Sequence, residues 1–101
     1  MTACPIEDRL ALEDLTIAYA HAVDSMHDVD GIAACFTEDA DYDLSGVGMP
    51  RAEGRAGIRA LFASIFAANA HHAHFLSNFA VTAYGGDSAS LRTYVRGLGR
   101  G

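Results

Sequence analysis

The strongest structural signal in the sequence lies in residues 6–43, IEDRLALEDLTIAYAHAVDSMHDVDGIAACFTEDADYD. From residue 6 to about residue 26, apolar side chains recur at helical spacing. They form two strips, one with Leu12, Leu15, Tyr19, Val23 and Met26 and the other with Leu10 and Ile17. Two apolar strips predict a long helix that is buried on two sides. Asp28 or Asp30 can then cap a short second helix.

The rest of the chain predicts one further helix and three strands. Residues 40–44 have the pattern of a strand, and a Gly-rich loop with Pro50 follows. Apolar positions in residues 55–69 fit a helix, whereas residues 72–84 and 89–96 are predicted strands around the turn signal Gly85-Gly86-Asp87. The order helix, helix, strand, helix, strand, strand predicts an α+β fold with antiparallel strands.

Length and charge limit the classes of protein to which the chain can belong. The 101 residues suffice for one small domain, so we expect residues 1–101 to form a single unit. Thirteen acidic against seven basic side chains give a formal net charge of −6, which disfavours nucleic acid or an anionic membrane as a partner. The sequence carries neither a signal-peptide pattern nor an apolar run of membrane-helix length, which favours a cytoplasmic location.

Asp24 and His74 are the candidate residues for chemistry. On a continued helix, Asp24 extends the strip of Leu10 and Ile17, where a buried carboxylate needs a partner. The alternative is that Asp24 has left the helix and caps the turn at Asp28. On a strand, His74 shares a face with Leu76 and Asn78, and this face offers polar groups to solvent or to a pocket.

The opposite face of that strand and the apolar face of the preceding helix are predicted to form the core. Each of these side chains sits on the apolar phase of its element. They are Phe62, Ile65, Phe66, Phe75, Phe79 and Val81.

The His71, His72 and His74 cluster raises the question of a metal site with Asp24 as a third ligand. Short histidine clusters without spaced partners are weak signals, so we expect no metal. The acidic run at residues 38–43 departs from a calcium loop, because Leu44 and Pro50 occupy the positions that need Gly and Glu. No glycine pattern for a nucleotide cofactor is present, and we expect no cofactor.

Three stretches together resemble the SnoaL-like branch of the nuclear transport factor 2-like superfamily. They are residues 6–43, residues 54–66 (GRAGIRALFASIF) and residues 71–89 (HHAHFLSNFAVTAYGGDSA). The positions that fit the family's motifs are Tyr19, Asp24, Phe36, Thr37, Asp39, Ala40, His74 and Asn78. The resemblance implies a cone-shaped α+β half-barrel, in which helices pack on a curved and mainly antiparallel sheet.

The resemblance also implies a function. In the dehydratases of this superfamily, the Asp that ends the first helix orients the strand His, which implies a catalytic Asp24–His74 dyad. Tyr19, Tyr42 and Asn78 are the predicted substrate-binding residues, as donors to a developing oxyanion. We therefore expect a cofactor-free lyase or isomerase that acts on a small apolar or polyketide-like substrate. The alternative is a non-catalytic module for ligand binding or oligomerisation, or an inactive fragment.

Domains of this family usually continue through two further long strands, whereas this sequence ends before them. We therefore expect a domain that is incomplete at its C-terminus, with the last two strands missing. Unpaired strand edges recruit other chains. We expect a homo-oligomer.

Overall fold

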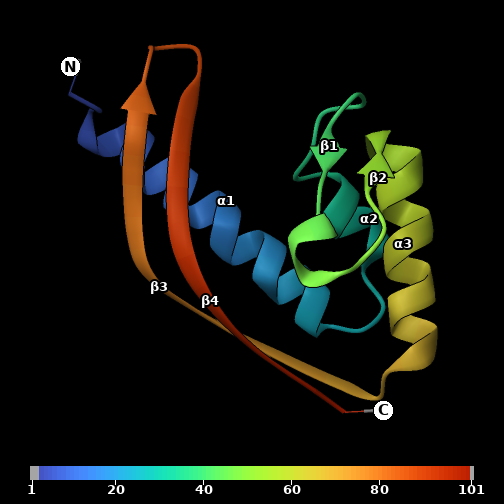
Figure 1. The fold of residues 1–101 in the computed structure, drawn as a ribbon. Helices are drawn as coiled ribbons and strands as arrows, with labels where there is room; N and C mark the ends of the chain where they lie inside the picture. Colours follow the sequence, from blue (N-terminus) through green and yellow to red (C-terminus); the bar gives the residue numbers. More distant parts are fainter. Residues whose placement is uncertain (1–2, 101) are drawn as a thin grey trace.

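The computed structural model describes residues 3–100 and has the predicted α+β order (Figure 1). The long helix α1 and the short helix α2 come first, and the third helix α3 lies between two pairs of strands. The elements are α1 (Ile6–Asp24), α2 (Val29–Ala33), β1 (Asp41–Tyr42), β2 (Ala52–Glu53), α3 (Gly54–Ala68), β3 (His71–Tyr84) and β4 (Ala89–Arg100). The sequence predicts every element except the two-residue β2 and the short 3-10 helix η1 (Ser45–Val47), which lies in the predicted Gly-rich loop.

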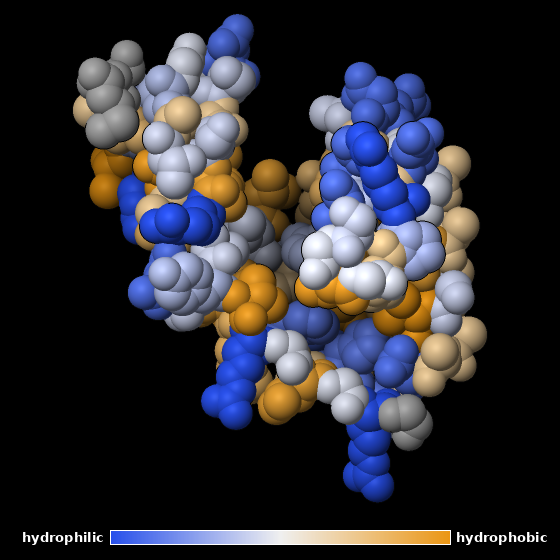
Figure 2. Space-filling view, in the orientation of Figure 1, coloured by the Kyte–Doolittle hydropathy of each residue, from blue (hydrophilic) through white to orange (hydrophobic). Residues whose placement is uncertain are grey.

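The strands form two separate antiparallel sheets, β1–β2 and β3–β4. Figure 1 shows α1 lying across one face of the long β3–β4 ribbon. Figure 2 shows a notch between this ribbon and the lobe of β1, β2 and α3. The radius of gyration is 14.3 Å, compared with about 13 Å for a compact domain of this length. The ribbon makes the molecule more open than a typical domain.

The buried core lies where the C-terminal half of α1 meets α2, α3 and β2. All of its members are apolar, and neither β3 nor β4 contributes a residue to it. They are Ala20, Ala22, Val23, Ile32, Ala33, Ala52, Ile58 and Phe62. The helical part is thus stabilised by its own core, and the ribbon is held by its contacts with α1.

Side-chain hydrogen bonds fix the start of α2 and the turn between α1 and α2. Asp28 caps α2 by accepting a hydrogen bond from the backbone N–H of Gly31 at 2.9 Å. A Cβ atom on Gly31 would lie 2.2 Å from the Asp28 Oδ2, so a larger residue at this position would displace the capping carboxylate. Asp24 is the last residue of α1 and does not cap the Asp28 turn, where Ser25 Oγ accepts the Asp28 N–H instead.

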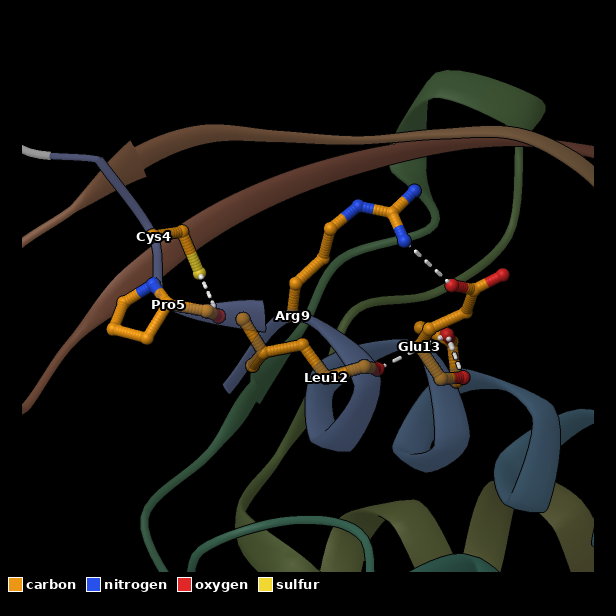
Figure 3. A network of polar contacts seen from close by, with 6 residues as sticks. Cys4, Pro5, Arg9, Leu12 and Glu13 are labelled. Carbon is orange, nitrogen blue, oxygen red and sulfur yellow. Dashed lines mark hydrogen bonds and ion pairs between the residues drawn. The ribbon is translucent and has the colours of Figure 1, made fainter. Parts of the chain in front are cut away.

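The N-terminal half of α1 is stabilised by its own surface contacts. Arg9 donates to Glu13 at 3.0 Å, one helical turn away, and the Thr16 hydroxyl donates to the backbone carbonyls of Leu12 and Glu13 (Figure 3). The predicted burial of α1 on two sides is wrong for this half. Leu10 is 50% exposed and Leu15 45% exposed, because no other element covers this half beyond the ribbon.

The predicted assignment of side chains to the two faces of β3 is wrong because the strand contains a β-bulge. The pairing with β4 slips between Ser77 and Ala80, and Asn78 has a φ of +56°. The extra residue shifts the alternation, so Phe79 turns toward α1, where the Arg9 guanidinium lies 5.3 Å from its ring centroid. Phe75 precedes the bulge and is 59% exposed, so its assignment to the core is wrong.

The helices do not have the length and hydropathy of membrane spans. Within residues 3–100, none is long and apolar enough to cross a membrane.

We predict that Phe62→Ala lowers the free energy of unfolding by about 3–5 kcal/mol, because it opens a cavity in the only apolar core of the described chain. The matched variant Phe75→Ala, at an exposed ring, should lower it by less than about 1 kcal/mol. Urea unfolding of both variants measures these changes. Equal losses would contradict the assignment of the core.

Candidate active site

Asp24 and His74 meet, although they are fifty residues apart in the sequence. The backbone N–H of His74 donates to Asp24 Oδ2 at 3.0 Å, and Nδ1 of the ring lies 2.5 Å from Asp24 Oδ1. About a quarter of each side chain is exposed. One carboxylate at the end of α1 therefore fixes both the backbone and the ring of a residue on β3.

This contact sets the protonation pattern of the imidazole. An ionised carboxylate only accepts hydrogen bonds, so the proton of a neutral His74 ring sits on Nδ1. The lone pair is then on Nε2, which has no hydrogen-bond partner among residues 3–100 and is not one of the buried polar atoms. Such an imidazole can act as a general base through Nε2.

A pocket of about 250 Å³ adjoins the pair, between α1 and β3. Its lining is mostly apolar apart from Asp24, His74 and His21. His21 precedes Asp24 by three residues on the same helix, so their side chains lie on the same face of α1. That spacing is the signal that could have placed His21 in this pocket.

His72 packs beside His74 but does not complete a metal centre. The two rings meet edge-to-face with centroids 5.8 Å apart, and the ring of Phe66 lies 6.2 Å from that of His72. Nδ1 of His72 is buried and has no hydrogen-bond partner. In the part of the chain that the structure describes, no three His, Cys, Asp or Glu side chains are grouped to hold a metal ion.

Tyr19 and Tyr42 form a hydrogen-bonded pair away from this pocket. Their hydroxyl groups bond to each other, and both rings contact Phe36 and Phe62. Burial raises the pKa of Tyr19 far above its ordinary value, and the bond to Tyr42 raises it further. Burial also raises the pKa of Tyr42, while its bond to Tyr19 opposes this. Substrate binding by the two residues stays a prediction.

Asn78 lies in the bulge of β3 and lines a second, smaller pocket of about 130 Å³. Ile17 and Leu76 line both pockets, so the two are neighbours. Asn78 does not line the pocket of Asp24 and His74. Its role in substrate binding also stays a prediction.

Comparisons with known proteins identify relatives of the chain. A family model described as a SnoaL-like domain matches residues 5–101. The crystal structure of a candidate aromatic ring hydroxylase from Novosphingobium aromaticivorans is 60% identical, with a TM-score of 0.95 over 96% of this chain and 68% of that one. No curated protein gave a match.

Two more distant structures share the fold. A candidate scytalone dehydratase from Novosphingobium aromaticivorans is 22% identical, with a TM-score of 0.81 over 94% of this chain and 62% of that one. Aln2 from a Streptomyces species is 18% identical, with a TM-score of 0.80 over 97% of this chain and 69% of that one. The chain therefore spans between 62% and 69% of the length of the three solved proteins.

We predict that the neutral His74 ring carries its proton on Nδ1 and that Asp24→Asn reverses this. The amide introduced by this substitution would use its oxygen for the His74 backbone N–H, so its NH₂ group would face Nδ1 and require an acceptor there. Nitrogen-15 NMR of the ring distinguishes the two tautomers. The same tautomer in both proteins would show that Asp24 does not control the ring.

We predict that the protein loses stability as the pH rises above about 10. The pKa values of Tyr19 and Tyr42 are raised in the folded state, so the unfolded chain releases these protons first and binds fewer of them. Tyr84, whose pKa is raised to about 12 by its hydrogen bond to Asp8, acts in the same direction.

Urea unfolding from about pH 9 to about pH 11 tests this dependence. The double variant Tyr19→Phe/Tyr42→Phe should lose less of its urea midpoint over this range than the parent. An equally steep loss in both proteins would show that the tyrosine pair does not cause it.

Proposed function

The chain belongs to the family of SnoaL-like domains, in the nuclear transport factor 2-like superfamily with its cone-shaped α+β fold, and we propose that it is a cofactor-free lyase or isomerase of the dehydratase type. Its substrate in this proposal is a small, largely apolar or polyketide-like carbonyl compound. One observation supports the proposal above all: Asp24 holds Nδ1 of His74 at 2.5 Å, and Nε2 is free to accept a proton.

The reaction begins with proton transfer to His74. The Nε2 lone pair takes a proton from the carbon next to the substrate carbonyl, and the electron pair of that C–H bond moves into an enolate. His74 becomes an imidazolium ion, whose charge the Asp24 carboxylate stabilises. A general base of this kind contributes about 10²–10⁴-fold to the rate.

The second half of the reaction determines the product. In an isomerisation, the imidazolium returns the proton to a different carbon of the enolate. In a dehydration, the enolate re-forms the carbonyl and expels a β-hydroxyl group, which takes the proton from Nε2 and leaves as water. Both routes restore neutral His74 and need no electron acceptor.

The walls of the pocket support an apolar substrate. Ile17 and Ala20 of α1 and Leu76 of β3 line it together with the Asp24–His74 pair. A pocket with apolar walls binds a hydrocarbon ring by removing its surface from water. It also strengthens the attraction between the Asp24 carboxylate and the imidazolium, because the local dielectric constant is lower than in water.

The structure at 60% identity favours a second candidate function. That protein is described as a candidate aromatic ring hydroxylase, so this chain would bind an aromatic ring and take part in its oxidation. Hydroxylation consumes oxygen, whereas proton abstraction by His74 does not. Oxygen uptake in the presence of an aromatic ketone therefore separates the two functions.

We predict that the protein accelerates exchange of the C1 protons of 2-tetralone in deuterated water, because these protons lie next to the carbonyl. His74→Gln should abolish the acceleration, since glutamine has no basic nitrogen at this position. Asp24→Asn should strongly reduce the acceleration of exchange. The amide would favour the tautomer with its proton on Nε2, and it would carry no negative charge to stabilise the imidazolium. Proton NMR of the ketone measures the rate.

His71→Gln is the matched control, since His71 neighbours His72 on the same strand and pairs with Arg100 rather than with Gly97. It should exchange 2-tetralone like the parent. Full exchange activity in both His74→Gln and Asp24→Asn would overturn the catalytic assignment. A well-folded parent that exchanges no faster than buffer would favour the non-catalytic alternative.

A further inference from the structure

Gly97 lies directly opposite the proposed base. It pairs with His74 across the β3–β4 ribbon, and paired residues project from the same face of a sheet. A Cβ atom on Gly97 would lie 3.4 Å from both Nε2 and Cδ2 of His74. Bare backbone of β4 therefore borders the free nitrogen of the imidazole.

The backbone does not require glycine at this position. The glycines with positive φ in the described chain are Gly48, Gly54 and Gly86, so Gly97 has a conformation open to other residues. A Cβ contact of 3.4 Å is ordinary van der Waals packing, so alanine also fits. Glycine weakens a strand interior and often marks a place where a ligand approaches the backbone.

The chemistry of His74 supplies a reason for the missing side chain. Proton abstraction requires the substrate carbon at about 3–3.5 Å from the nitrogen that takes the proton. A Cβ atom of residue 97 would stand at this same distance from Nε2. A side chain there would compete with the substrate for the position beside the base.

We propose that Gly97 is a specificity-determining residue of the Asp24–His74 site, and that its missing side chain admits the flat face of a ring ketone beside Nε2. This inference rests on the proposed function. The room freed is that of a single small side chain, about the thickness of one planar ring.

The test compares two ketone sizes in the proton-exchange assay. Gly97→Val should reduce exchange of 2-tetralone relative to exchange of acetone by about tenfold or more, because the small ketone reaches Nε2 past the new side chain. Gly97→Ala should change the ratio in the same direction by a smaller factor. A variant that merely damaged the fold or the Asp24–His74 pair would reduce the exchange rates of both ketones by the same factor.

Gly99 provides the matched control. It lies on the same strand two residues away, and its Cβ would contact Cδ2 of His72 at 3.7 Å rather than His74. Gly99→Ala and Gly99→Val should leave the ratio within about twofold of the parent. If Gly97→Val fails to fold, the ratio of 2-tetralone exchange to acetone exchange is compared between Gly97→Ala and Gly99→Ala instead.

Two outcomes separate this inference from the proposed function. If His74→Gln abolishes exchange while the Gly97 variants keep the parent's ratio, the function stands and the role of Gly97 is overturned. If the parent exchanges neither ketone, the proposed function fails, and NMR shifts of the His74 ring on addition of 2-tetralone decide the binding role. Shifts lost in Gly97→Ala and kept in Gly99→Ala support it, whereas shifts kept in both, or absent in the parent, overturn it.

Discussion

The contact between the Asp24 carboxylate and His74 joins the two parts of this protein. The β3–β4 ribbon contributes no residue to the buried core, so it depends on α1 for its position. Along α1, Tyr84 bonds to Asp8 at one end of the ribbon, Arg9 covers Phe79, and Asp24 binds His74 near the other end. Only the last of these also orients a potential base. The same carboxylate thus both attaches the ribbon to α1 and orients the imidazole.

The two parts differ in what stabilises them. The helical part has a close-packed apolar core around Ile32, Ile58 and Phe62, whereas the ribbon relies on polar contacts and half-exposed side chains. Regions with few buried apolar contacts open more readily than a core. A row of aromatic contacts runs from Phe62 through Phe66 and His72 to His74, and connects the core with the proposed base. The imidazole is thus supported on one side by rings and on the other by a carboxylate.

The faces of β3 show where a sequence pattern fails. Strict alternation along residues 74–81 places Phe75 with Phe79, and it is this inference that the bulge at Asn78 overturns. One extra residue exchanges the two faces of the strand beyond it, here as far as the second register shift between Val81 and Ala83. An Asn tolerates the left-handed conformation, but many strand asparagines do not adopt it. The position of the bulge depends on pairing with β4, which no local pattern records.

The sequence by itself determined the type and order of the main elements, the presence of an Asp cap at the start of α2 and the burial of Phe62. These features follow from contacts between residues a few positions apart, or from the spacing of apolar side chains along one element. The resemblance to SnoaL-like domains also implied that Asp24 and His74 are partners. Only the tertiary structure decided that the carboxylate binds both N–H groups of His74, that His21 lines the same pocket and that Gly97 borders Nε2. These depend on the crossing of α1 and β3 and on the register of β4, which are set by the packing of the whole chain.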